Sequence, residues 1–280
     1  DKFNTLQLGM VSSERIFKVF DTKEFIPDTG TVKDKKINGD ISFQNVWFAY
    51  INEDWVLKDL SLNIPAGKMT ALVGATGSGK SSIVNTISRL YDFQKGNILL
   101  DGISVRDYEL AYLRRNIAMV MQDVFLFSDT VFNNITLGDA AITMNQVTEA
   151  ARAVGVDRFI ERLPGKYNYT VGERGATLST GQRQLLSFVR AYVYNPSILI
   201  LDEATSSIDT ETEILIREAT ARLTKNRTSI VVAHRLATIQ QADKIIVLEH
   251  GKVAEEGTHF QLLRNNGLYK QLYEIQFASL

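Results

Sequence analysis

The sequence of 280 residues contains no cysteine, which excludes disulfide bonds, thiolate zinc sites and cysteine nucleophiles. It also has no excess of either charge, because 31 lysines and arginines stand against 32 acidic residues. A balanced chain gives no electrostatic footprint for nucleic acid, and we expect no nucleic-acid partner. No apolar run approaches the roughly 18 residues of a membrane span, and no signal-peptide pattern opens the chain.

The first residues differ in character from the rest. The chain opens with Asp1 instead of methionine, and we expect it to be a piece of a longer protein. Ser12 or Ser13 can cap a helix that runs to about Phe20, and the polar residues 28–36 that follow are typical of a solvated linker. We therefore predict a helix and linker over residues 1–38 and a globular domain over residues 39–280, whose 45% hydrophobic content can fill a core.

Residues 74–81 (GATGSGKS) fill every fixed position of the P-loop pattern G-x-x-x-x-G-K-[ST]. The apolar residues 69–73 before it predict a buried strand, and residues 81–90 after it predict a helix, with apolar side chains up to Leu90 on one side. Average residue usage would produce such a string by chance in roughly one chain of this size in a hundred. A glycine-rich turn between strand and helix therefore points to a phosphate site.

The chemistry of this loop follows from its residue types. Glycines let successive N–H groups point at one spot, where the helix dipole also favours an anion. Lys80 would neutralise the outer phosphates, and the Ser81 hydroxyl would face Mg²⁺. The predicted phosphate-binding residues are Gly74, Thr76, Gly77, Ser78, Gly79, Lys80, Ser81 and Ser82.

A second apolar run, residues 198–201, ends in Asp202 and Glu203. Alone, this pattern is only a strand that meets a turn. Because it lies after the P-loop and before another buried strand pattern at 229–233, we interpret it as the Walker B strand. Asp202 would hold Mg²⁺, and Glu203 would reach the attacking water as general base or orienter.

The remaining patterns predict the architecture. Apolar residues alternate over 41–50, with a phase shift that indicates a bulge, and again over 60–64. These two segments predict antiparallel strands, and residues 97–105 predict a hairpin. Helical spacing over 146–154 and 157–163 predicts an inserted helical lobe at about 124–190. The last predicted elements are a helix at 211–223, a hairpin at 245–254 and a single helix at 262–275. Together these patterns predict an α/β P-loop NTPase with an antiparallel β subdomain and an α-helical subdomain.

With these motifs in order, residues 41–275 resemble the nucleotide-binding domain of ABC transporters. The family signature is L-S-G-G-Q, and residues 178–182 here are LSTGQ, so Thr180 departs from it. The resemblance implies that Tyr50 stacks on adenine, Gln122 contacts metal and water, Asp209 belongs to the D-loop and His234 is the switch histidine. Without the resemblance these four would be a strand aromatic, a polar strand end, a helix N-cap and a structural histidine.

The resemblance also implies partners and a place of action. ATP with Mg²⁺ would be sandwiched between two domains, with Ser179, Gly181 and Gln182 of one completing the site of the other. Residues 170–175 resemble the X-loop of exporters, and the N-terminal helix resembles the link to membrane domains, normally fused N-terminally. These features predict an exporter motor at the cytoplasmic face of the cell membrane. The motor would work as a homodimer or a heterodimer, since Thr180 in the signature is compatible with both assemblies.

Two other functions are weighed against this one. A soluble ABC-type ATPase acting on nucleic acid or the ribosome would have coiled-coil heptads between the Walker motifs, a second cassette or a basic face, and none is seen. A non-hydrolysing regulatory module would lack the Walker B glutamate, but Glu203 is present. The other two histidines, His250 and His259, are predicted to lie in a turn and on the surface.

Overall fold

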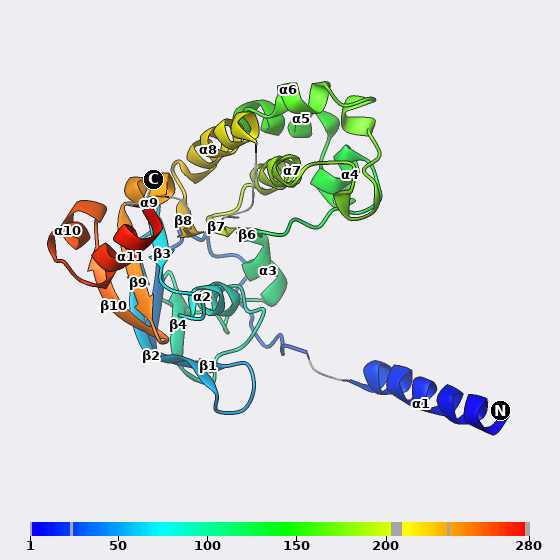
Figure 1. Ribbon diagram of the computed structural model, residues 1–280, viewed down its shortest axis with the longest axis horizontal. Coiled ribbons are helices and arrows are strands. Elements are labelled where there is room, and N and C mark those ends of the chain that lie inside the picture. The colour runs from blue at the N-terminus through cyan, green and yellow to red at the C-terminus, as the bar shows by residue number, and fades with distance from the viewer. Residues whose placement is uncertain (1, 23–24, 203–208, 234–235, 278–280) are drawn as a thin grey trace.

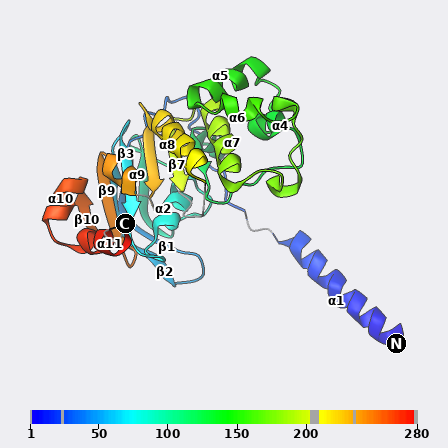
Figure 2. The ribbon, with the colours of Figure 1, turned by 45° about the horizontal axis from the view of Figure 1, so that its top comes forward.

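The computed structural model describes residues 2–22, 25–202, 209–233 and 236–277. Two β-sheets and a lobe of helices form the body of the molecule, from which helix α1 (Lys2–Asp21) extends away (Figures 1 and 2). No residue of α1 is buried, whereas the body has two apolar cores. Within the described ranges, no helix is both long enough and apolar enough to cross a membrane.

The larger sheet has six strands in the order β10-β9-β3-β8-β7-β6 and is parallel except for β10. Its central strands β3, β7 and β8 are buried on both faces: in β7, Leu199 and Leu201 lie in one core, while Ile198 and Ile200 lie in the other. This double burial explains the continuous apolar runs that predicted β3, β7 and β8. The bounds are β3 Met69–Val73, β6 Ile117–Val120, β7 Ile198–Asp202, β8 Thr228–Val232, β9 Lys244–Glu249 and β10 Lys252–Gly257.

The smaller sheet is antiparallel, in the order β2-β1-β4-β5. It comprises β1 Ile41–Ala49, β2 Trp55–Ile64, β4 Lys95–Leu100 and β5 Ile103–Ser104. The predicted bulge in β1 is confirmed, because the register shifts between Phe43 and Val46 and Asn45 has a φ of 49°. One core lies between this sheet, the larger sheet and helix α2 (Lys80–Ile87).

The helical lobe covers the other core and lies to one side of the sheets (Figure 1). The predicted helix near 146–154 is α5, which begins at a capping box of Thr143 and Gln146 and ends at Gly155 with a φ of 87°. The lobe also contains two helices that residue spacing did not predict, α4 and α7. Its helices, with the neighbouring α8, are α4 Val131–Thr136, α5 Met144–Val154, α6 Asp157–Glu161, α7 Thr180–Val193 and α8 Thr210–Thr224.

Several predicted helix limits were wrong. Helix α1 begins at Lys2 and not at Ser12 or Ser13, because an exposed serine does not end a helix whose apolar spacing continues upstream. Helix α2 ends at Ile87, since Arg89 adopts a φ of 47°, and Leu90 is therefore exposed instead of facing the core. The remaining short helices are α3 Leu110–Arg115 and α9 Leu236–Gln241.

Residues 25–40, which include the predicted solvated linker at 28–36, are largely exposed but are hydrogen-bonded to the domain. The Arg89 guanidinium donates to the Pro27 carbonyl at 3.0 Å, and the Asp28 carboxylate accepts from the Leu110 N–H at 3.0 Å, at the start of α3. Farther along, the Asp101 carboxylate accepts from the Asp40 N–H at 2.9 Å. The segment is therefore a strap held along the smaller sheet and α3, not a free linker.

The C-terminal segment differs from prediction in two ways. It forms two helices, α10 (His259–Arg264) and α11 (Leu268–Phe277), because Asn266 has a φ of 53° and interrupts helical geometry. His259, predicted on the surface, is only 5% exposed, and its Nδ1 lies 2.7 Å from the Tyr269 hydroxyl. Burial lowers the pKa of His259 below its ordinary 6.5 and raises the pKa of Tyr269 to about 12.

This burial predicts a pH dependence of stability. Folded His259 resists the proton that the unfolded chain accepts at pKa 6.5, so the free energy of unfolding should fall as pH drops below that value. His259→Phe keeps an aromatic ring but cannot titrate, so its stability should fall less between pH 6.5 and about pH 5. Denaturant unfolding across this range measures the difference. The control is His250→Asn, in an exposed turn, which should follow the parent; an unchanged slope in His259→Phe would contradict the account.

Candidate nucleotide-binding site

The P-loop, Asp202 and Gln122 lie at the carboxyl edge of the parallel strands. Strand β3 ends at Val73 and leads into the P-loop, β7 ends at Asp202, and β6 ends two residues before Gln122. Because these strands are parallel, with β8 between β3 and β7, their carboxyl ends share one edge of the sheet. This edge is where ligands bind in open α/β sheets.

The P-loop runs from β3 into α2 through backbone that glycine permits. Gly79, which precedes α2, has a φ of 106°, and a Cβ there would lie 2.8 Å from Leu57 Cδ2. Gly77 has a φ of 81° but would have no atom within 4 Å of a Cβ. Gly79 is therefore required by packing against β2, whereas Gly77 leaves open space in front of the start of α2.

Lys80 lies 8% exposed at the start of α2. Its Nζ donates to the carbonyl of Gly74 at 2.7 Å and to that of Ala75 at 3.0 Å. Burial lowers the pKa of the Lys80 ammonium, and the Asp202 carboxylate acts in the opposite direction. The loop thus holds a buried cation beside backbone N–H groups, a combination suited to a polyphosphate.

The remaining donors fit a nucleoside triphosphate with Mg²⁺. The Ser78 hydroxyl is buried with no hydrogen-bond partner among the described residues, whereas Ser81 is exposed at the open side. The described residues hold no cluster of three or more His, Cys, Asp or Glu side chains that could bind a metal ion. Mg²⁺ is usually held by one or two carboxylates together with phosphate oxygens, and the Asp202 carboxylate at the end of β7 is a donor of this kind.

The structure places some predicted catalytic residues and not others. Asp202 is half-buried at the end of β7, and Gln122 is exposed beyond β6. Glu203, His234 and residues 206–208 lie outside the described residues, so their roles remain predictions. Asp209 is described: its carboxylate accepts from the Thr212 N–H at 2.9 Å and caps α8, and hydrogen bonds from Thr212 lower its pKa. The N-cap interpretation of Asp209 is therefore confirmed.

Tyr50 directly follows β1 and is 44% exposed. Its hydroxyl lies 3.1 Å from the Ser82 hydroxyl and accepts a hydrogen bond from Asn85 Nδ2 at 3.0 Å. The ring also meets Tyr91 edge to face, with 4.9 Å between the centroids. Tyr50 is thus attached to the helix that begins at the phosphate site, and the prediction did not include Asn85 or Tyr91.

The signature residues lie on the helical lobe, at the start of α7 (Figure 1). Ser179 and Gln182 form a capping box, and Gly181 is buried within the first turn. The Thr180 hydroxyl accepts from the Arg183 guanidinium at 3.1 Å. Among the described residues, no hydrogen bond joins residues 179–182 to the P-loop. The signature thus lies on the helical lobe, whereas the P-loop lies between β3 and α2.

A strand, a P-loop and a helix at the carboxyl edge of a parallel sheet define a P-loop NTPase. Comparison with known proteins narrows this class, because a family model described as ABC transporter matches residues 57–206. The chain belongs to the ABC transporter family, as its nucleotide-binding domain.

Individual relatives agree with this assignment. The chain is 49% identical over 99% of its length to an uncharacterized ABC transporter ATP-binding protein, YknV, of Bacillus subtilis, covering 46% of that protein. It is 47% identical over 97% of its length to an ATP-dependent lipid A-core flippase of Haemophilus influenzae, covering 46% of it. The solved structure of a bacterial Atm1-family ABC exporter with ATP bound matches 98% of the chain with a TM-score of 0.86 and 37% identity, over 48% of that exporter chain. The chain thus spans about half the length of these relatives.

Two glycines that combine a left-handed φ with open space around them, Gly67 and Gly77, provide a test of the phosphate cradle. Gly77→Ala and Gly67→Ala each place a Cβ on a left-handed backbone with no atom within 4 Å, so each should cost about 1–2 kcal/mol of stability. Only Gly77→Ala, at the start of α2, should also weaken ATP binding, because its methyl group enters the phosphate site. Calorimetric titration of both variants measures this, and equal affinity for ATP would show that the cradle is elsewhere.

Proposed function

We propose that this chain binds ATP with Mg²⁺ and hydrolyses it, as the motor domain of an ABC exporter. The observation that carries the proposal is the buried Lys80 ammonium within a glycine-rich turn, at the same sheet edge as Asp202. The relatives support it, since they include a protein named as an ATP-dependent flippase and an exporter solved with ATP bound.

Each residue at this edge has a distinct role in the proposal. Backbone N–H groups of residues 74–82 and Lys80 hold the phosphates, and Ser81, Asp202 and Gln122 hold Mg²⁺. Mg²⁺ bound there neutralises charge on the phosphate oxygens. Glu203 orients the attacking water and takes its proton as the bond to the γ-phosphorus forms and the bond to the leaving ADP oxygen breaks. His234 and Gln122 position the same water and phosphate.

The placement of the signature supports a dimer as the working unit. Ser179, Gly181 and Gln182 lie on the helical lobe and do not bond to their own P-loop within the described structure. The exposed ends of the P-loop and of α7 are half-sites that a second nucleotide-binding domain completes. The partner is either a second copy of this chain or a different domain with an unmodified signature, as Thr180 indicates.

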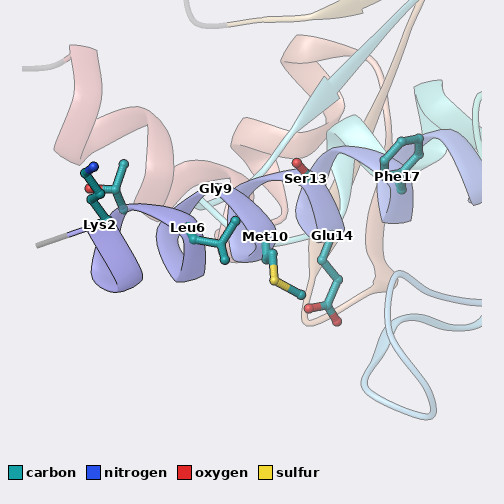
Figure 3. A pocket seen from close by; sticks show the side chains of 8 residues that line it. Lys2, Leu6, Gly9, Met10, Ser13, Glu14 and Phe17 are labelled. Carbon is teal, nitrogen blue, oxygen red and sulfur yellow. The ribbon is translucent and has the colours of Figure 1, made fainter.

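Two surfaces that expose large apolar side chains among polar ones fit membrane domains as further partners. Figure 3 shows one face of α1, where Leu6, Met10 and Phe17 lie alongside the small residue Gly9, all on a helix with no buried residue. The second surface is a groove of about 270 Å³ on the helical lobe, beside Phe127 and Leu137, which are each more than half exposed.

The X-loop lies next to this groove. Residues 170–175 are fastened to its rim by the Val171 N–H, which donates to the Asp129 carbonyl at 2.9 Å. A movement of a partner in the groove would therefore displace the X-loop. The X-loop would pass this displacement on to the signature. In this proposal the domain works at the cytoplasmic face of a cell membrane.

The proposal separates binding from chemistry at two residues. Lys80→Ala should weaken ATP binding, because the phosphates lose their buried cation. Glu203→Gln should keep ATP affinity, abolish turnover and favour a dimer, because water loses its orienting base while the phosphate site is intact. Equilibrium titration and phosphate release measure both effects. Turnover of Glu203→Gln at the parent rate under saturating ATP would refute the assignment of Glu203.

Thr180 distinguishes the two possible assemblies. In the full transporter that contains this chain, Thr180→Gly should change turnover substantially if the transporter is a homodimer, because both sites then contain the substitution. In a heterodimer the substitution affects only the site that pairs this signature with the partner's Walker motifs. The site that contains this chain's own Walker motifs is unchanged, so turnover should change little. Thr180→Ser is the control, since it keeps the hydroxyl that accepts from Arg183. An active transporter purified with one kind of subunit would exclude the heterodimer.

A further inference from the structure

The hydroxyl of Tyr50 is bonded to two side chains of α2, the helix that starts at the phosphate site. Ser82, one of these, is 4% exposed, and its hydroxyl lies 3.1 Å from that of Tyr50. Asn85, one turn farther along, donates from Nδ2 to the Tyr50 hydroxyl at 3.0 Å. The aromatic ring and the P-loop are therefore linked by side-chain hydrogen bonds as well as through the core.

The Tyr50 ring is also held by two other aromatic rings. Phe48, which is 1% exposed and so part of the core, meets it edge to face with centroids 4.7 Å apart. Tyr91 meets it from another direction at 4.9 Å and 86°. Such contacts favour one orientation of the ring, while 44% of Tyr50 stays accessible.

Asn85 joins these two sets of contacts. Its backbone carbonyl accepts from the N–H of Leu90 at 2.9 Å and of Tyr91 at 3.4 Å, just beyond the end of α2. Its side-chain amide reaches Tyr50. The same residue thus places the Tyr91 backbone and restrains the Tyr50 hydroxyl. An aromatic side chain at an exposed strand end without such restraints would have to be ordered when a base binds, which weakens affinity.

We infer that Asn85 and Tyr91 are positioning residues for the nucleobase. They hold the Tyr50 ring at a fixed place relative to the P-loop, so that a base and the triphosphate attached to it are recognised as one rigid ligand. The inference rests on the proposed function, in which Tyr50 stacks on the base. It assigns to both residues selectivity for a nucleoside triphosphate over an inorganic polyphosphate, although neither contacts the phosphates.

The test compares two ligands, ATP and inorganic tripolyphosphate, at the same Mg²⁺ concentration by calorimetric titration of the whole chain. Asn85→Ala and Tyr91→Leu should each raise the Kd for ATP by about three- to tenfold, the effect of one lost hydrogen bond or ring contact. The Kd for tripolyphosphate should not change. Tyr91→Phe keeps the ring and should bind ATP as the parent does.

Four further variants complete the design. Tyr50→Phe loses the contacts of its hydroxyl with both Asn85 and Ser82, so it should weaken ATP binding at least as much as Asn85→Ala. The double variant should be no weaker than Tyr50→Phe, because the bond to Asn85 is already lost. Tyr112→Phe is the matched control: its hydroxyl donates to the Lys35 carbonyl on the strap, and neither Kd should change. Tyr50→Ala is the reference for complete loss of the base platform.

The outcomes separate the inference from the proposed function. If Tyr50→Ala weakens ATP binding but Asn85→Ala and Tyr91→Leu do not, the inference is wrong and the stacking role of Tyr50 stands. If Asn85→Ala and Tyr91→Leu weaken both ligands equally, the two residues only support the fold of α2, and the inference is again wrong. If Tyr50→Ala binds ATP as the parent does, Tyr50 does not stack on the base, and both fail.

Discussion

The fold depends on one constraint, which is that the first turn of α2 must follow the carboxyl end of β3 through the tight P-loop turn. That arrangement requires Gly79 in a left-handed conformation against Leu57, and it requires Lys80 to be buried at the base of the loop. An anion is the natural ligand for such a helix start, because both the orphan N–H groups and the helix dipole favour negative charge. The two cores hold the turn in place: Ala71 and Val73 are buried in one, and Leu72 in the other.

The same constraint explains the division into subdomains. The smaller sheet supplies Leu57 behind the P-loop and Tyr50 beside α2, so it supports the phosphate site and presents an aromatic ring to the same side. The helical lobe carries the signature at the start of α7, where Ser179 and Gln182 form a capping box. Two helix starts, one behind the P-loop and one on the lobe, thus lie on different parts of one chain. This geometry is the physical reason to expect a second domain.

Motifs that depend on neighbouring residues were predictable from the sequence, and contacts between distant residues were not. The P-loop, the bulge in β1 and the strand ending at Asp202 are local patterns, and each lies where it was expected. The partners of Tyr50 could not be predicted, because Asn85 and Tyr91 reach it only after α2 packs beside β1. His259 was misjudged for the same reason, since its polar neighbours in sequence conceal its burial against Tyr269. Two errors had local signals: the S-x-x-Q capping box marks the start of α7, and Asn265-Asn266-Gly267 marks the break before α11.

The central claim is that a nucleoside triphosphate binds at the carboxyl edge of the parallel sheet. Hydrogen–deuterium exchange of the chain, with and without ATP and Mg²⁺, tests it most directly, because the backbone N–H groups of the loop are the proposed ligands. The account predicts slower exchange in peptides that cover residues 74–82 and in the segment around Tyr50, with no change at α5 or α10. Unchanged exchange over residues 74–82 at saturating ATP, or protection confined to another part of the chain, would contradict it.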